Sequence, residues 1–373
     1  MRGALKPLPG VKTVFVKPGK KLVTVTYDPK KTTSAEILSA LKEKGEEAEA
    51  RPARAGLLPS AEPRPGDSVK AVLEAFDKFP LVALVEAPGL EQEHEWILSV
   101  LRDPSFPDKA NDIVVEFGNS LYQAVLNRYL SGEEIPRSQL CQLWQDSPYS
   151  PFLSWEAPVY ERFFSTVRAI NQSLPASRRI RVLLTAPAVD WAKMHTKQDF
   201  EAVTKLQKPP KPVLATMVER DVLARGRKAL VIGTGEHLFR RTEKNDLAEI
   251  EKLRPGSMLV VVPHLGFGGR AKELEAKLAS WPRPSLAFLK GTWLGAVYED
   301  ELAFEDVADA YLYLGPADSL TVSHPSPEIY KDDIYFAELY RRLKVQGGGS
   351  AEPLESARAG FLREKPRRWV DNQ

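Results

Sequence analysis

The fold is determined by the stretch LVALVEAPGLEQEHEWILSVLRDPSFPDKANDIVVEFGN, which occupies residues 81–119. It begins with an apolar strand at 81–85, continues with a helical stretch at 94–101, and returns to an apolar strand at 113–116. Strands that are apolar at almost every position are typical of parallel sheets, because helices cover both of their faces. The stretch therefore predicts one strand–helix–strand unit of an α/β fold.

The same alternation continues along the chain as far as residue 314. Further apolar strands are expected at 180–185, 229–232, 258–262, 285–289 and 310–314. Between them, helices are expected at 121–130, 159–174, 213–225, 247–253 and 272–280. The intervals are long enough to return each parallel strand to the same end of a sheet. We therefore predict an α/β fold with a largely parallel sheet and helices on both faces.

The composition narrows the class of protein. The chain has 373 residues, of which 43% are hydrophobic and 27% charged, and its formal net charge is only +2. This balance argues against nucleic acid or an anionic membrane as the main partner. The single cysteine, Cys141, excludes an intrachain disulfide and a cysteine-rich zinc module. No apolar run has the length of a membrane span or the pattern of a signal peptide, so we expect a cytoplasmic protein with no membrane partner.

Residues 1–53 are expected to form a small unit of the ferredoxin-like α+β kind. Alternating valines on either side of Pro18 indicate a hairpin, and Thr33 with Glu36 predicts a capping box at the start of a helix. The order of these elements and the phrase LPGV at 8–11 resemble a heavy-metal-associated domain. The first strand and the Cys-x-x-Cys loop of such a domain are absent, and thiolates are the ligands that copper(I) prefers. We therefore expect no metal capture by this unit.

Two segments without hydrophobic periodicity delimit the main domain. Residues 54–68, which include three prolines and two glycines, predict a linker. Residues 69–345 are expected to form the α/β domain. The phrase QGGGS at 346–350 begins a segment, 346–373, that is expected to be a flexible tail.

Ionisable side chains follow several of the predicted strands. Ligands of parallel sheets bind outside the carboxyl ends of the strands, so these positions are candidates for a site. The residues in question are Glu86, Glu116, Asp190, His237 and His264, with His94 and Arg240 shortly after the first and fourth of them. Residues 290–293 follow the strand expected at 285–289 in the same way, whereas turns with Pro, Arg or Lys introduce the opposite strand ends. We predict that the ionisable residues gather at one rim of the sheet.

Carboxylates and imidazoles at one rim permit two kinds of chemistry. A neutral histidine can take a proton from water while a carboxylate orients its ring. Two histidines with one or two carboxylates can equally bind a metal and leave one position open. The chain lacks the Gly-x-Ser-x-Gly turn of serine hydrolases and the Gly-x-x-x-x-Gly-Lys-Ser/Thr phosphate loop. Structural roles stay open: Glu116 could cap a helix or pair with Arg128, and His237 could be an ordinary core or surface histidine.

Several phrases resemble the erythromycin esterase, ChaN and Tiki superfamily over about residues 70–345. They are VEFGN at 115–119, LYQ at 121–123, DW at 190–191, EHLFRR at 236–241 and VPHLGF at 262–267. The resemblance implies an active or metal-binding centre whose first-strand glutamate, second-strand glutamate and later histidine correspond to Glu86, Glu116 and His237. The chain departs from the superfamily at Val85 and Thr234, where glycine is usual, and at Pro88, where histidine is usual.

The leading prediction is a hydrolase-type site. In it, Glu86 and Glu116 orient water or a base, and His237 is the base or a ligand. His94, Asp190, His264 and Arg240 are expected to bind a small-molecule or peptide ligand. Because Pro88 replaces an imidazole, a degenerate site that no longer catalyses is also open. The alternative is a non-enzymatic protein that binds haem or a divalent metal. Haem would need an axial ligand in an apolar pocket, for which His237, His264 and Tyr122 are candidates.

Overall fold

The structure is a computed structural model that describes residues 5–16, 23–46, 48, 61–148, 157–206, 213–240, 245–265, 271–299, 302–347, 353–363 and 367–372. The chain divides into two compact units, Met1–Leu57 and Leu58–Gln373. Each unit is described by itself below.

The N-terminal unit contains an antiparallel hairpin followed by one helix. The hairpin pairs β1 (Val11–Val16) with β2 (Val23–Tyr27), and α2 (Ser34–Lys42) follows. The predicted capping box is present, because Thr33 N–H donates to Glu36 Oε2 at 2.7 Å and Glu36 N–H donates to Thr33 Oγ1 at 3.3 Å. The buried residues of this unit are Leu5, Val14, Ile37 and Leu41. Its resemblance to a heavy-metal-associated domain stays a prediction.

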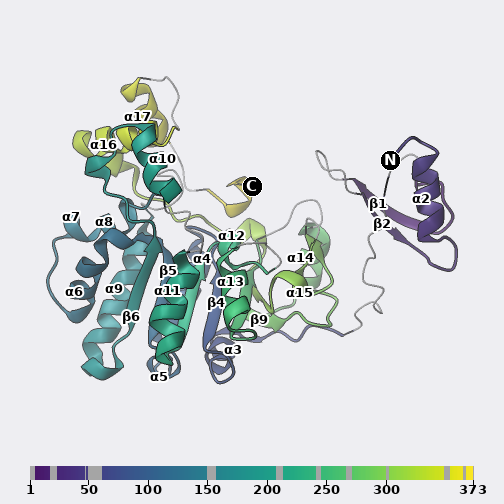
Figure 1. Ribbon diagram of the computed structural model, residues 1–373, viewed down its shortest axis with the longest axis horizontal. Coiled ribbons are helices and arrows are strands. Elements are labelled where there is room, and N and C mark those ends of the chain that lie inside the picture. The colour runs from purple at the N-terminus through teal and green to yellow at the C-terminus, as the bar shows by residue number, and fades with distance from the viewer. Residues whose placement is uncertain are drawn as a thin grey trace. The chain divides into compact units, whose positions relative to one another are not determined.

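The larger unit is built on one eight-stranded sheet (Figure 1). Its strands lie side by side in the order β3 (Gly66–Asp67), β9 (Ser285–Phe288), β12 (Ala310–Tyr313), β8 (Met258–Pro263), β4 (Leu81–Val85), β7 (Ala229–Gly233), β5 (Asp112–Asn119) and β6 (Arg181–Ala186). The six strands from β12 to β6 are parallel, and β9 pairs antiparallel with both of its neighbours. The predicted α/β fold with a largely parallel sheet is therefore confirmed. A separate short hairpin pairs β10 (Tyr298–Glu299) with β11 (Leu302–Ala303).

Helices cover both faces of this sheet (Figure 1). One face, here the α4 face, packs against α3 (Ser68–Ala75), α4 (Glu91–Arg102), α5 (Phe106–Lys109), α6 (Gln123–Ser131), α7 (Arg137–Leu140), α8 (Gln142–Gln145) and α9 (Pro158–Ser173). The other, the α13 face, packs against α11 (Val213–Met217), α12 (Gly235–Leu238), α13 (Asp246–Leu253), α14 (Ala271–Leu278) and α15 (Phe304–Val307). In Figure 1, α10 (Lys197–Leu206), α16 (Asp333–Val345) and α17 (Leu354–Arg363) lie above β5 and β6. No helix in the described part of the chain is both long and apolar enough to cross a membrane.

The continuous apolarity of the strands follows from this two-sided cover. In β4, Val82 and Leu84 are buried on the α4 face, while Leu81, Ala83 and Val85 are buried on the α13 face. Successive side chains of a strand point to opposite faces, so a strand between two helical layers needs apolar residues at every position.

The strand β9, which lies between the edge strand β3 and β12, differs from the prediction. Because it is antiparallel to β12, its carboxyl end lies at the edge where the parallel strands begin, and residues 290–293 do not join the predicted rim. A short apolar run carries no signal of strand direction. Two further elements lie in segments for which no regular structure was expected: β3 within 54–68, and α17 within 346–373.

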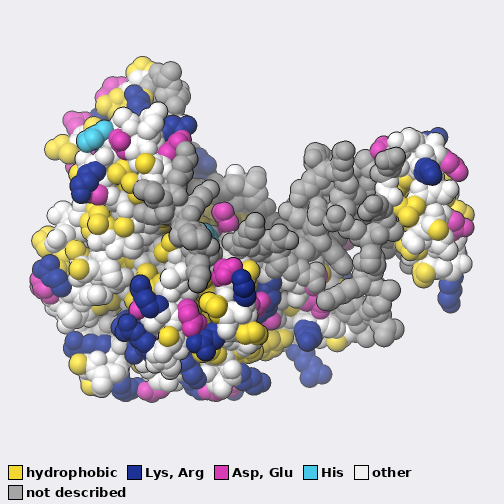
Figure 2. Space-filling view, viewed as in Figure 1, with side chains coloured by type: hydrophobic (Ala, Val, Ile, Leu, Met, Phe, Trp, Pro, Cys, Tyr) yellow, Lys and Arg dark blue, Asp and Glu magenta, His cyan; other side chains and the backbone are white. Residues whose placement is uncertain are grey.

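Basic residues lie at the amino ends of two of the parallel strands, Arg181 at the start of β6 and Arg227 with Lys228 just before β7. Figure 2 shows Lys and Arg side chains along the lower edge of this unit. Arg181 and Arg227 bind the buried carboxylate of Asp112 at N–O distances between 2.6 and 2.8 Å. These bidentate pairs compensate the charge of Asp112 at the start of β5. The amino edge is thus occupied by structural ion pairs, and the carboxyl edge remains the place for a site.

Candidate functional site

The predicted rim is divided between the two faces of the sheet. In β5, Val115 and Phe117 are buried on the α4 face, so Glu116 between them points to the α13 face. The side chain of Glu86 instead contacts His94 of α4 and Tyr160 of α9, on the α4 face. Strand β7 lies between β4 and β5. In the described residues no hydrogen bond or ion pair joins Glu86 to Glu116 or His237. The structure does not bring the three predicted catalytic residues together.

On the α4 face, four buried polar residues form a group that we name the acid cluster: Glu86, Glu93, His94 and Tyr160. His94 Nε2 lies 2.9 Å from Glu86 Oε1, and the Tyr160 hydroxyl donates to the same oxygen at 3.1 Å. Ala87 N–H donates to Glu93 Oε2 at 2.8 Å. The cluster therefore ties the turn after β4 to α4 and α9. His94 was predicted as a binding residue, and its ring instead faces Glu86.

The acid cluster contains two buried carboxyl groups, and hydrogen bonds satisfy only part of their oxygens. Burial raises the pKa of Glu93 well above its usual value, against the hydrogen bond from Ala87, and the charge of Glu86 raises it further. Burial therefore favours the neutral form of the Glu93 carboxyl group. Glu86 Oε2 is buried without a hydrogen-bond partner. Such an orphan oxygen is unusual in a protein interior and marks a strained or functional position.

On the α13 face, two carboxylates hold the predicted histidine in an arrangement that we name the His237 clamp: Glu116, His237 and Asp246. His237 Nε2 lies 3.1 Å from Glu116 Oε1, and Nδ1 lies 2.7 Å from Asp246 Oδ2. Thr234 N–H donates to Glu116 Oε2 at 2.7 Å, and Ala215 N–H donates to Asp246 Oδ1 at 2.7 Å. Both acids are thus held by backbone donors as well as by the imidazole.

The His237 clamp fixes the charge of the imidazole. Burial by itself lowers the pKa of His237, but the hydrogen bonds and charges of Asp246 and Glu116 outweigh it and raise that pKa to about 10. An imidazolium has no lone pair for a proton, a metal ion or haem iron. The predicted role of His237 as a base or ligand therefore does not fit its surroundings, because both of its nitrogens are donors to acids.

Two other predicted binding residues are engaged by neighbouring side chains. His264 is fully buried, with Nδ1 2.6 Å from the Tyr311 hydroxyl and Nε2 2.8 Å from Glu275 Oε1. Burial lowers the pKa of His264 and outweighs the effect of Glu275. Arg240 is partly buried and forms ion pairs with Glu251 at 2.9 Å and with Asp309 at 2.6 Å. The contacts of His264 join the end of β8 to β12 and α14, and those of Arg240 join the residue after Phe239 to α13 and to the start of β12.

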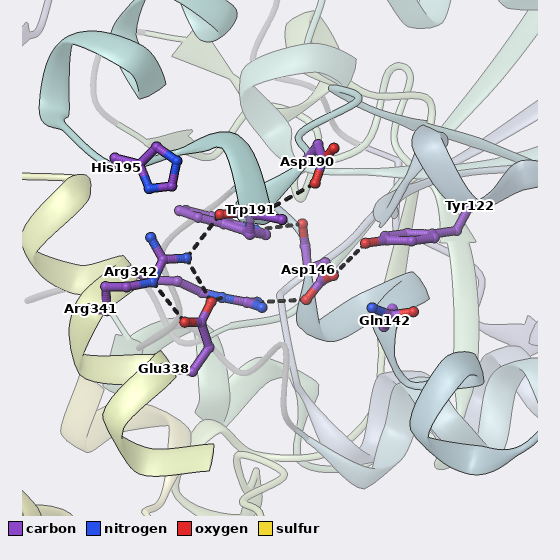
Figure 3. A pocket seen from close by; sticks show the side chains of 10 residues that line it. Tyr122, Gln142, Asp146, Asp190, Trp191, His195, Glu338, Arg341 and Arg342 are labelled. Atoms are coloured by element: carbon purple, nitrogen blue, oxygen red, sulfur yellow. Dashed lines mark hydrogen bonds and ion pairs between the residues drawn. The ribbon is translucent and has the colours of Figure 1, made fainter. Parts of the chain in front are cut away.

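The last predicted residue, Asp190, lines a cavity of about 510 Å³ that we name the Trp191 cavity (Figure 3). Its walls are Tyr122, Gln142, Asp146, Asp190, Trp191, Ala192, His195, Glu338, Arg341 and Arg342. Asp190 pairs with Lys193 at 3.0 Å, and this hydrogen bond lowers the pKa of Asp190. The cavity lies beyond the carboxyl ends of β5 and β6, because Tyr122 follows β5 and Trp191 follows β6.

The acids of the Trp191 cavity are engaged by its own residues. Asp146 accepts from the Tyr122 hydroxyl at 2.6 Å and from Arg342 Nη1 at 2.6 Å. Glu338 accepts from Arg342 Nε at 2.7 Å and from Arg341 at 2.7 and 2.8 Å. Burial raises the pKa of Tyr122, and Asp146 reinforces the shift, so the phenol keeps its proton.

Several donors of the same cavity are left over. Arg342 Nη2, the His195 ring and the Gln142 amide have no hydrogen-bond partner among the described residues. Figure 3 shows His195 above Arg341 and Trp191, with Tyr122 and Gln142 on the other side of Asp146. Phe200 stacks on the Trp191 ring with centroids 5.4 Å apart, and the Arg342 guanidinium lies 5.1 Å from its centroid. A ligand would thus meet the edge of the indole and the unused N–H groups.

Most of these cavity residues were missed from the sequence. A search at the ends of the predicted strands does not find Asp146, Glu338, Arg341 or Arg342, because none of them follows such a strand. The phrases LYQ at 121–123 and DW at 190–191 were the available signal, and both contribute a wall residue. Nothing in the sequence connects α16 with these two turns.

No metal site is formed by the described residues. Within them, no group of three or more His, Cys, Asp or Glu side chains is placed to hold a metal ion. The residues expected to supply such a group are divided between the acid cluster, the His237 clamp and the core.

No protein-family model and no curated protein matches the chain. Three solved structures are similar to it. The type III effector HopBA1 shares 15% identity over 70% of this chain and 100% of its own, with a TM-score of 0.38. A Bacillus cereus protein shares 9% over 76% and 98%, with a TM-score of 0.46. ChaN of Campylobacter jejuni, in a structure with cofacially bound haem, shares 13% over 66% and 91%, with a TM-score of 0.36. At these values the superfamily resemblance stays a prediction.

Proposed function

We propose that this protein binds a small acidic molecule in the Trp191 cavity and does not transform it. The observation that carries the proposal is the imbalance of hydrogen-bonding groups in the cavity walls. The carboxylates of Asp146 and Glu338 are saturated by arginine and tyrosine donors, while Arg342 Nη2 and the His195 ring are unused. A guanidinium edge is a strong donor to a carboxylate or phosphate.

The position and size of the cavity support the same proposal. Ligands of parallel sheets bind beyond the carboxyl ends of strands, where Tyr122 and Trp191 lie. The volume of about 510 Å³ is within the range of small-molecule sites. The carboxylates of Asp146 and Glu338 already accept from tyrosine and arginine donors, so neither is placed to exchange a proton with a ligand as a general acid or base.

Haem fits this cavity poorly. His237 and His264 have both nitrogens engaged, and the Tyr122 hydroxyl donates to Asp146. Of the described histidines, His195 alone lines the cavity with an unengaged ring. The walls are mostly charged or amide side chains, whereas haem needs an apolar slot.

Titration with citrate and inorganic phosphate tests the proposal, with tryptophan fluorescence as the readout. We expect saturable binding, weakened about tenfold in His195→Ala, which loses one of the free donors. His324→Ala is the matched control, because His324 is also a loop histidine but does not line the cavity. Absence of saturation by either anion contradicts the proposal. With hemin we expect no shift of the Soret band. A shift that occurs in the parent protein and disappears in His195→Ala would show that the cavity binds haem and not an acidic molecule.

Water-activating hydrolysis at the acid cluster is the second candidate function. It is favoured by Glu86 Oε2, a buried carboxylate oxygen with no hydrogen-bond partner, in the same cluster as Glu93, whose pKa burial raises. Purified protein would be assayed for ester and peptide hydrolysis together with Glu86→Gln. Activity lost in the variant supports this function, and activity that persists unchanged removes Glu86 from it.

A further inference from the structure

The turn after β4 is covered by two segments from distant parts of the chain. Residues 320–323 lie antiparallel to the turn, with a bridge between Leu90 and Val322. Ser323 N–H donates to Gly89 O at 2.7 Å, and Glu91 N–H donates to Thr321 O at 3.0 Å. The other side of the same turn closes the acid cluster, because Ala87 N–H donates to Glu93. Residues 87–91 are therefore a lid over the cluster, and 320–323 hold the lid in place.

The C-terminal residues 367–372 complete this arrangement as a third strand-like segment. Thr321 and Arg368 form an antiparallel bridge. Trp369 N–H donates to Leu320 O at 2.8 Å, and Val322 N–H donates to Arg367 O at 3.0 Å. The Trp369 side chain packs on the apolar group formed by Ala87, Leu90 and Leu320. The segment thus touches both the lid and its support.

One contact of this segment with its support is imperfect. Two backbone hydrogen bonds, named above, join the segment to residues 320–322, and the Arg368–Asp371 pair at 3.0 Å lies within the segment. Trp369 Nε1 is buried without a hydrogen-bond acceptor. Burying an indole N–H without an acceptor costs free energy, so the seated state of Trp369 is only weakly favoured.

We propose that residues 367–372 act as a displaceable latch, which keeps the 87–91 lid closed over the acid cluster. When the latch leaves, residues 320–323 lose their outer neighbour and the lid loses its contact with Trp369. Solvent and small molecules then reach the orphan oxygen of Glu86 and the ring of His94. The latch concerns the acid cluster and is independent of the Trp191 cavity.

The test compares the full chain with a chain that ends at residue 366, and with Trp369→Ala. Amide hydrogen exchange should rise at least about tenfold in residues 87–91 and 320–323 of both variants, while β4 stays protected. Asp371→Ala is the matched control, since among the described residues the side chain of Asp371 pairs with Arg368 inside the latch itself, and its exchange should equal that of the full chain. Unchanged exchange in the shortened chain, or a rise that extends through β4 and β5, overturns the proposal.

Histidine modification by diethyl pyrocarbonate gives an independent readout within the same samples. The exposed His195 should react in every variant, and the fully buried His264 in none. His94 should react only when the latch is removed or Trp369 is replaced. If His94 stays unreactive in the shortened chain, the lid does not depend on the latch.

Discussion

The two faces of the sheet treat the same residue types in opposite ways. On the α4 face, Glu86 and His94 are sealed together with a second acid, and one oxygen has no partner. On the α13 face, Glu116 and Asp246 hold His237, whose side chain keeps 29% of its exposure. In the first arrangement one carboxylate oxygen has no hydrogen-bond partner, and in the second each carboxylate contacts the imidazole and accepts from a backbone N–H. Surroundings, rather than residue identity, decide what a carboxylate and an imidazole can do.

The largest effect that separates the two faces is expected at Glu86. Glu86→Ala leaves the His94 ring and the Tyr160 hydroxyl without their acceptor in a fully buried place. We expect the free energy of unfolding to fall by about 3–4 kcal/mol, measured by urea denaturation. Glu86→Gln keeps the shape and one acceptor oxygen, so its loss should be about 1–2 kcal/mol. A loss below about 1 kcal/mol in Glu86→Ala would show that the acid cluster does not support the fold.

A smaller effect with a distinct pH dependence is expected at His237. The pKa of His237 in the folded protein, about 10, lies above its ordinary value of 6.5. Its stabilising contribution is therefore complete below pH 6.5 and disappears as the pH rises through about 10. His237→Ala should lower the free energy of unfolding by about 2 kcal/mol at pH 6, and the difference from the parent protein should vanish above pH 10. A difference that does not change with pH would contradict a charged clamp.

The smallest effect is expected at Glu93, and it sharpens the contrast between the faces. The pKa of Glu93 is raised above the ordinary value of 4.5. The wild-type residue therefore lowers the free energy of unfolding by a growing amount as the pH rises above that value. Glu93→Gln retains an acceptor for Ala87 N–H and removes this cost. We expect a change within about 1 kcal/mol near neutral pH, more favourable at pH 8 than at pH 5. Clear destabilisation at pH 8 would mean that Glu93 is an anion.

The sheet could be predicted because its cause is local. Strands covered on both faces are apolar at every position, and each predicted strand from residue 81 onward is present in the structure. The direction of β9 could not be predicted, because a short, mostly apolar strand such as Ser285–Phe288 packs equally well in either direction. The short β3 could not be predicted either, because it forms by pairing with β9 and no local sequence pattern indicates that pairing.

The candidate site was predictable only in part, since it depends on strand order. Glu86 directly follows β4 and Glu116 lies within β5, and β7 comes between these two strands in the sheet. The face to which each acid points depends on the exact register of its strand, and a shift of one residue reverses it. Strand ends predicted from the sequence are not exact enough to define that register. Arg342 reaches Asp146 across 196 positions of sequence, and that contact has no sequence signature.

The central place of β7 has a consequence for the synthesis of this protein. A growing chain that has emerged only as far as Gly226 already contains β4, β5 and β6, but it lacks the strand that joins β4 to β5. The middle of the sheet therefore stays open on the ribosome, with both edges of β4 and one edge of β5 unpaired. Completion must wait for residues 229–233 and then β8, so we expect slow, late folding and a need for protection of those edges until the second half arrives.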